Sequence, residues 1–220
     1  MIKNEKRTLF AGLFFIAAFA VLTALILTVD VHPWGQNGTD IGFASFNRRF
    51  HGLTGVNMML YTITDWLGLV PIAVCIIFGA TGLCQLIKRR SLFKVDRDLI
   101  VLGVYYAVII FAYLLFEAVP VNFRPVFIDG VLEASYPSST VLLVLSVMPT
   151  LSEQTDRRLS NTARKKAIRL FVVLFCAFMV TGRLISGVHW FTDIAGSVIL
   201  SAGLFLLYKS CVLRFCQDEK

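Results

Sequence analysis

Charged residues are scarce in this chain, since Asp, Glu, Lys and Arg together make up only 16% of its 220 residues. Hydrophobic residues account for 57%, and the mean hydropathy is +0.75. A soluble domain of this length seldom has so apolar a composition, and long runs without charge are typical of membrane proteins. The composition therefore argues against a soluble domain and predicts an all-α integral membrane protein.

Cysteine and histidine are also few. The five cysteines form no Cys-x-x-Cys pair, and no cluster of the three histidines accompanies them. This pattern argues against a disulfide framework and against a metal site, so the cysteines are interpreted as small buried apolar side chains. We expect neither a metal nor another cofactor.

The formal net charge of +7 would point to nucleic acid in a soluble protein. Here the basic residues gather in particular loops: the N-terminus, the loops at 88–98 and 152–167, and the C-terminal tail. By the positive-inside rule, this asymmetry predicts that both termini face the cytoplasm. We therefore expect a multi-pass protein of the cell membrane, in contact with the lipid bilayer and without a nucleic-acid partner.

Six apolar segments are candidate spans, because a helix needs about 20 apolar residues to cross a hydrocarbon core of about 30 Å. The first is too long for a signal peptide and ends without a clear cleavage site, so it is interpreted as a retained span. The fourth is short, and becomes adequate if its helix starts near Ser138 and continues past its apolar part. The segments are Leu9–Val29, Leu67–Ile87, Leu99–Val119, Ser139–Leu151, Ile168–Ile185 and Phe191–Leu213.

The segment between the first two spans, Asp30–Trp66, is too polar to cross the bilayer. Its apolar residues recur at near-helical intervals, which predicts an amphipathic helix lying in the outer membrane interface. Such a helix either covers the ends of the spans or assists lipid entry. The recurring residues are Ile41, Phe43, Phe46, Phe50 and Leu53. Because no repeat or linker interrupts the chain, residues 1–220 are predicted to form one domain, and nothing in them indicates an oligomeric state.

Ionisable residues between apolar runs are costly, which makes Arg183, His189 and Asp193 candidates for a functional site. If a helix begins near His189, Asp193 lies one turn further along the same face. A carboxylate placed there accepts a proton from one imidazole nitrogen and leaves the other free to attack. Arg183 offers donors that suit phosphate oxygens. Anchoring of the chain at the membrane surface is the alternative role for these residues.

Two other outer loops carry features of anion binding. Residues 137–140 read Pro-Ser-Ser-Thr and resemble a helix start, where unpaired backbone amides and hydroxyl groups form an anion site. An ordinary helix cap is the alternative there, and a lipid-headgroup contact is the alternative for Arg124. Taken together with the His–Asp pair, the three loops describe a phosphate-binding site with a nucleophile.

These three loops resemble the signature of the type 2 phosphatidic acid phosphatase and vanadium haloperoxidase superfamily. That signature reads Lys-x6-Arg-Pro, then Pro-Ser-Gly-His, then Ser-Arg-x5-His-x3-Asp. The third motif here is Gly-Arg-x5-His-x3-Asp over residues 182–193, with the family spacing. The second is Pro-Ser-Ser-Thr at residues 137–140, and the first keeps only Arg-Pro at residues 124–125. The resemblance includes the six-span layout and so covers about the whole chain.

The resemblance implies a membrane lipid phosphatase. The charge asymmetry of the loops predicts that its site faces outward, and the lack of a visible metal-ligand set predicts that it needs no metal. His189 would attack phosphorus and form a phosphohistidine, with Asp193 orienting its ring. The substrate would be a lipid phosphate or a polyprenyl pyrophosphate. The expected phosphate-binding residues, which include the first residues of the fourth span, are Arg124, Ser138, Ser139, Thr140 and Arg183. We expect the rings of Tyr136, Trp190 and Phe191 at headgroup level.

Two departures from the signature bear on catalysis. Glu117 stands where the family has its lysine, and Thr140 stands where the family has the histidine that protonates the leaving group. A hydroxyl is no acid near neutral pH, and general acid catalysis typically contributes about 10²–10⁴-fold. Either Glu117 or His51 supplies the proton, or a pyrophosphate substrate needs little acid, or the protein only binds or transports a phosphorylated lipid. A further possibility is that Glu117 pairs with Arg183 or Arg124 and orients it.

Overall fold

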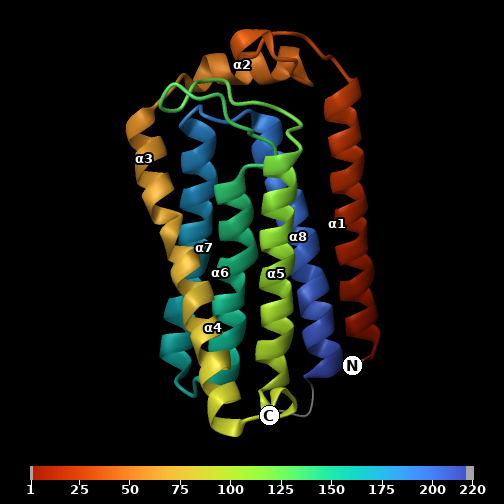
Figure 1. Ribbon diagram of the computed structural model, residues 1–220, viewed down its shortest axis with the longest axis vertical. Helices are drawn as coiled ribbons and strands as arrows, with labels where there is room; N and C mark the ends of the chain where they lie inside the picture. Colours follow the sequence, from red (N-terminus) through yellow and green to blue (C-terminus); the bar gives the residue numbers. More distant parts are fainter. Residues whose placement is uncertain (1, 217–220) are drawn as a thin grey trace.

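The computed structural model describes residues 2–216, and long helices packed side by side make up its bulk (Figure 1). Within these residues no strand is present, only isolated bridges, as the all-α prediction requires. Two short 3-10 turns, Gln36–Gly38 and Leu92–Lys94, lie in connections. The helices are α1 (Ile2–Thr28), α2 (Ala44–Thr54), α3 (Met58–Leu67), α4 (Leu69–Arg89), α5 (Arg97–Ala118), α6 (Ser139–Arg158), α7 (Thr162–Ile185) and α8 (Phe191–Phe215).

The two ends of the bundle differ in what they carry. α1 begins and α8 ends at one end, which also holds the turns that lead into α5 and α7 (Figure 1). The opposite end carries α2 and the loops at 119–138 and 186–190 (Figure 1). The loops that contain the candidate site residues therefore share one end of the molecule. Which end faces the cytoplasm stays a prediction.

Five stretches within residues 2–216 are long and apolar enough to cross a membrane. They correspond to α1, to α3 and α4 taken together, and to α5, α7 and α8. The chain is thus an integral membrane protein. The fourth predicted span forms α6, which is not among the five, so the count of six spans stays a prediction.

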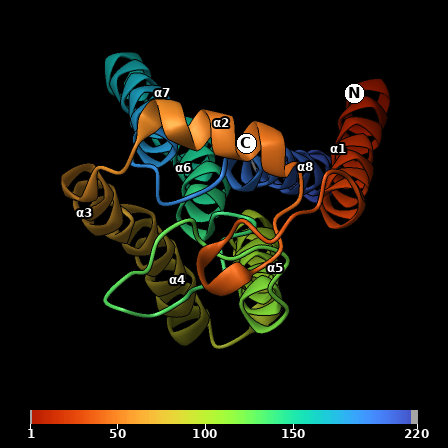
Figure 2. The same ribbon diagram turned by 90° about the horizontal axis from the view of Figure 1, so that it is seen from above.

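α6 lies in the middle of the bundle, with other helices around it (Figure 2). Its Val144, Val147 and Met148 are fully buried in the main apolar core. Some of its buried polar groups have partners on neighbouring helices: the hydroxyl of Thr150 lies 2.8 Å from that of Tyr106, and the hydroxyl of Tyr105 donates to the backbone carbonyl of Ser146 at 3.0 Å. Because protein rather than lipid surrounds much of α6, a shorter apolar run suffices there.

The predicted second span, Leu67–Ile87, begins too late. Helical structure starts at Met58, and Gly68 separates α3 from α4. Pro71 has no amide hydrogen for the carbonyl of Leu67, which accounts for a break at this point. The other predicted spans agree with α1, α5, α6, α7 and α8 except at their ends. Because the apolar run starts at Met58, Asp65 lies inside it rather than in a loop.

The predicted amphipathic segment forms α2, which lies across the end of the bundle (Figures 1 and 2). Phe46 and Phe50 each place their ring centroid 5.2 Å from that of Phe191 at the start of α8. Asn47 is buried, and its side-chain amide donates to the hydroxyl of Thr192 at 3.0 Å. α2 therefore covers the start of α8, and its contact with a membrane interface stays a prediction.

Tyr136 and Trp190 are buried in the protein rather than exposed to lipid, and their position at headgroup level stays a prediction. Tyr136 stacks on Phe19 with a centroid distance of 5.8 Å, and its hydroxyl lies 2.8 Å from that of Thr23. The indole N–H of Trp190 donates to the carbonyl of Phe123 at 2.8 Å. The two rings attach the 119–138 loop to α1 and α8.

Tight packing at Tyr136 leads to a stability prediction. A Cβ on Gly196 would lie 2.4 Å from Cε2 of Tyr136, whose hydrogen bond and stacking hold it in place. We expect Gly196→Ala to destabilise the protein by about 1–3 kcal/mol, because overpacking forces side chains or backbone to shift. The measurement is the thermal unfolding midpoint in detergent. Gly79→Ala is the matched control, since no heavy atom lies within 4 Å of its Cβ position. Equal midpoints for the two variants would contradict the prediction.

Candidate active site

His189 and Asp193 lie together at the start of α8. Nδ1 of His189 is 3.6 Å from Oδ2 of Asp193, and both side chains are buried. This distance is too long for an ordinary hydrogen bond, although the two side chains are close enough to interact electrostatically. Nδ1 has no hydrogen-bond partner among the described residues. A small movement of the ring would complete the bond that orients it.

The carboxylate of Asp193 is held by donors from two loops. The backbone amide of Trp190 donates to Oδ2 at 2.9 Å, and the side-chain amide of Asn122 lies 3.4 Å from Oδ1. The first contact caps α8, since amides in a first helical turn have no partner within the helix. Asp193 therefore keeps its position by the same contacts that begin the helix.

Nε2 of His189, the other ring nitrogen, faces the start of α6. It lies 3.2 Å from Oγ of Ser138, the residue before that helix. The amide of Ser138 donates to the carbonyl of Asp193 at 3.2 Å, and the hydroxyl of Ser197 donates to the carbonyl of Ser138 at 3.0 Å. The beginnings of α6 and α8 are thus joined, and Nε2 lies beside Ser138 and the first turn of α6.

Arg183 is almost fully buried near the end of α7. Its Nη2 donates to Oγ1 of Thr140 at 2.7 Å and lies 3.3 Å from Oδ1 of Asp65. The guanidinium sits over the ring of Tyr61, 4.7 Å from its centroid. A buried guanidinium needs such compensation, and these contacts join α7 to α3 and α6.

Arg124 comes from the 119–138 loop and lies near the same ring, 5.7 Å from the centroid of Tyr61. Its Nε is 3.0 Å from Oε2 of Glu133, but the alignment is not that of a hydrogen bond. Within residues 2–216, Nε and Nη1 of Arg124 and Nε of Arg183 are buried without hydrogen-bond partners. Buried donors are seldom left unpaired, so these three N–H groups are suited to the oxygens of an anion.

Burial lowers the pKa of His189 well below its usual range, and the positive charges of Arg124 and Arg183 lower it further. The imidazole is therefore neutral near pH 7. A neutral imidazole has a lone pair on one nitrogen and a proton on the other. With the proton on Nδ1, toward Asp193, the lone pair lies on Nε2 beside Ser138.

A sequence model described as the PAP2 superfamily matches residues 101–215. The chain belongs to the PAP2 superfamily. The solved structure of a protein described as the first transmembrane PAP2-type phosphatidylglycerolphosphate phosphatase from Bacillus subtilis has a similar fold. The TM-score is 0.69 at 15% identity, and the match covers 95% of this chain and 99% of that chain. A search of curated proteins found no significant match.

The PAP2 match contains the loops of all three motifs, and the structure brings most of their candidate residues together. Ser138, Thr140, Arg183, His189 and Asp193 are linked by the contacts described above. Arg124 joins them through the ring of Tyr61. Ser139 begins α6 beside Thr140. Within the described residues, no group of three or more His, Cys, Asp or Glu side chains is placed to hold a metal ion.

Among the described residues, Glu117 and His51 form no hydrogen bond or ion pair with His189, Thr140 or either arginine, although Glu117 lines a small pocket with Ser139. Glu117 is exposed in the last turn of α5. The two arginines have other carboxylate partners, Glu133 and Asp65, so the prediction that Glu117 pairs with one of them was wrong. Nε2 of His51 lies 3.0 Å from the carbonyl oxygen of Gly187, in the turn before His189. His51 supports that turn.

Sequence reasoning missed Tyr61, Asp65, Asn122 and Glu133. The sequence does contain a signal for Asp65, because an acidic residue within an apolar run is a functional candidate. It was missed because the predicted span began at Leu67, two residues after Asp65. Tyr61 carries no such signal, because an aromatic ring in an apolar helix is common. Asn122 and Glu133 lie in an irregular loop, where sequence spacing does not give position in space.

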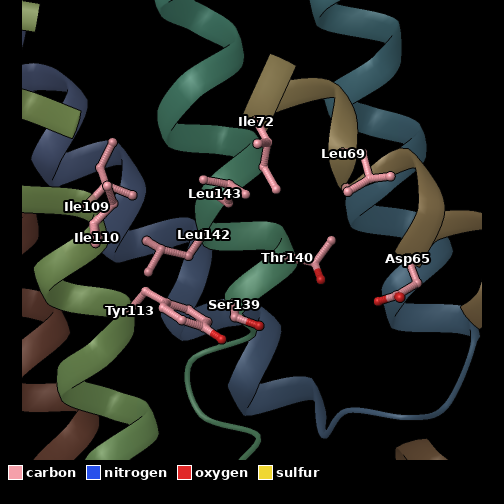
Figure 3. Close-up of a pocket in the computed structure, with 11 residues that line it drawn as sticks. Asp65, Leu69, Ile72, Ile109, Ile110, Tyr113, Ser139, Thr140, Leu142 and Leu143 are labelled. Atoms are coloured by element: carbon pink, nitrogen blue, oxygen red, sulfur yellow. The ribbon is translucent and has the colours of Figure 1, made fainter. Parts of the chain in front are cut away.

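A cavity of about 410 Å³ opens beside the PAP2 residues, between α4, α5 and α6. Figure 3 shows the polar side chains of Asp65, Ser139 and Thr140 on one side of it and apolar residues such as Ile72 and Leu143 toward the other. The cavity therefore joins the polar side chains of Asp65, Ser139 and Thr140 to an apolar surface of α4 and α5, where Leu69, Ile72 and Ile110 are exposed.

The lowered pKa of His189 predicts a neutral ring in mildly acidic solution. An unfolded histidine titrates near pH 6.5. As the pH falls through that value, His189 binds a proton in the unfolded chain but not in the folded protein, so it makes the protein less stable below about pH 6.5.

Histidine-selective NMR in detergent should show the ring of His189 neutral at pH 6, and the His189→Gln variant assigns the signal. The thermal midpoint should fall more between pH 7.5 and pH 5.5 in the wild type than in His189→Gln. A titration midpoint at or above 6.5 would contradict this prediction.

Proposed function

We propose that this PAP2 protein is a membrane lipid phosphatase with His189 as its nucleophile. The observation that carries the proposal is a buried imidazole, with a lowered pKa, beside two buried arginines that have three nitrogens without hydrogen-bond partners: Nε and Nη1 of Arg124 and Nε of Arg183. A phosphate group would supply the missing acceptors and place phosphorus near Nε2. The first turn of α6, with Ser138, Ser139 and Thr140, offers further donors to the same group.

A lipid is the substrate that best suits the surroundings of the site. The cavity of about 410 Å³ is mainly apolar and opens beside Ser139 and Thr140. A hydrocarbon chain in this cavity would leave its phosphate at the polar side. The similar structure from Bacillus subtilis is described as a phosphatidylglycerolphosphate phosphatase, which also favours a lipid phosphate. A polyprenyl pyrophosphate would suit the same features.

The proposed reaction has two steps. Nε2 of His189 attacks phosphorus, the bond to the leaving oxygen breaks, and a phosphohistidine forms while Asp193 stabilises the charged ring. Arg124 and Arg183 stabilise the charge on the equatorial phosphoryl oxygens. Water then hydrolyses the phosphohistidine and releases phosphate. By the positive-inside rule, this site faces outward from the cell membrane and both termini are cytoplasmic.

A second candidate function is phospholipid binding or transport without hydrolysis. Thr140 favours it, because this residue cannot donate a proton near neutral pH. The buried nucleophile at His189 favours hydrolysis, because an anion-binding pocket needs donors but no neutral imidazole held beside a carboxylate.

Phosphate release by the detergent-purified protein separates the two functions. We expect release from phosphatidic acid or from a polyprenyl pyrophosphate, and its loss in His189→Ala. Asp193→Asn should lower kcat by a factor on the order of 10²–10⁴, because it removes the charge that stabilises the imidazolium. Rapid-quench labelling should detect an acid-labile phosphoprotein in the wild type only. No release from either lipid would reject hydrolysis of these substrates and favour a binding protein.

A further inference from the structure

The leaving group of the proposed reaction needs a proton that Thr140 cannot supply. Of the acids expected from the sequence, Glu117 is exposed at the end of α5 and His51 contacts the carbonyl of Gly187. Neither contacts Thr140 or Arg183 in the part of the chain that the structure describes. A carboxylate that does lie at the place of the missing acid is on another residue, Asp65 of α3.

Asp65 and Thr140 share one nitrogen of Arg183. Nη2 of that arginine is 3.3 Å from Oδ1 of Asp65 and 2.7 Å from Oγ1 of Thr140. The carboxylate therefore lies next to the residue that replaces the family's acid. Its side chain is 55% exposed, and it lines the same cavity as Thr140 and Ser139 (Figure 3). A substrate phosphate held by Arg183 would thus come within reach of Asp65.

A second departure from the family signature brings Asp65 to this place. Gly182 stands where the signature has serine, and a Cβ at this position would lie 2.8 Å from Cγ2 of Thr64. The absence of a side chain on α7 lets α3 approach closely at this point. Thr64 then lies against Arg183, with its Oγ1 3.5 Å from Nη1, and Asp65 follows it. The two departures from the signature, Gly182 and Thr140, thus both lie where Asp65 contacts Arg183. Asp65 itself lies outside residues 101–215, which the family model matches.

We propose that Asp65 is the general acid of this protein, in the place of the histidine that Thr140 replaces. The inference rests on the proposed phosphatase function. A substrate phosphate bound by Arg183 would bring the leaving oxygen beside the carboxyl group of Asp65. The phosphorus–oxygen bond then breaks toward the leaving oxygen, and the proton of Asp65 moves to that oxygen to give the alcohol.

The second half of the reaction returns the proton. A water molecule attacks the phosphohistidine, and the carboxylate of Asp65 accepts one of its protons. The phosphorus–nitrogen bond breaks, its electron pair returns to Nε2, and phosphate leaves. His189 is then neutral and Asp65 protonated again, so the cycle consumes one water and one phosphate ester.

The test compares two substrates with the same hydrocarbon tail, an alkyl phosphate and a nitrophenyl phosphate. An alkoxide needs the proton to leave, whereas a nitrophenolate does not. We expect Asp65→Asn to lower kcat on the alkyl phosphate by about 10²–10⁴-fold and on the nitrophenyl phosphate by less than about tenfold. Asp65→Glu, which keeps the carboxyl group, should retain part of the activity that Asp65→Asn loses.

Asp156→Asn is the matched control. The carboxylate of Asp156 also pairs with an arginine, Arg169, at 2.7 Å, but near the other end of the bundle. It should leave both rates unchanged.

Three results would overturn the role of Asp65. Equal losses on both substrates would show that Asp65 only positions Arg183. Unchanged rates would show that another group donates the proton, and a selective loss in Glu117→Gln or His51→Ala instead would identify that group. In each of these cases His189→Ala would still abolish turnover of both substrates. Wild-type protein without any His189-dependent turnover would overturn the phosphatase function together with this inference.

Discussion

The buried charge of Arg183 is the constraint on which the site depends. An isolated guanidinium in a helix bundle costs several kcal/mol, so it requires partners with opposite charge or suitable acceptors. Those partners come from two other helices: Tyr61 and Asp65 on α3, and Thr140 on α6. The need to compensate one cation therefore joins three helices at the place where a phosphate would bind. A bound phosphate would compensate the charge of Arg183 in place of the carboxylate of Asp65.

The 119–138 loop belongs to the site for a related reason. It contributes Arg124, whose donors are only partly used, and Asn122, which contacts Asp193. The ring of Tyr136 and the indole N–H of Trp190 attach this loop to the bundle, so its polar groups are positioned before any ligand arrives. Such preorganisation is what makes charge stabilisation effective in a site that excludes water.

The organisation of the bundle follows from where its polar groups are. α1, α5, α7 and α8 have long apolar runs, whereas α6 carries buried Thr and Gln side chains that form hydrogen bonds with neighbouring helices. A helix in the centre does not need a surface that is apolar all round. This arrangement places the first turn of α6, where backbone donors are free, at the centre of the end that holds the site.

Local spacing was sufficient to predict the all-α membrane fold, most helix positions and the pairing of His189 with Asp193, because a helix places residues four apart on one face. Tertiary structure alone decided the partners of the arginines. Arg183 meets Asp65 across 118 positions in the sequence, and Arg124 meets Glu133 rather than Glu117. Sequence spacing cannot tell which carboxylate pairs with which arginine, because any carboxylate at the same end of the bundle could compensate the positive charge. The close approach of α3 to α7 at Gly182 settled the partner of Arg183, and the backbone pairing of Arg124 with Glu133 inside the 119–138 loop settled the partner of Arg124.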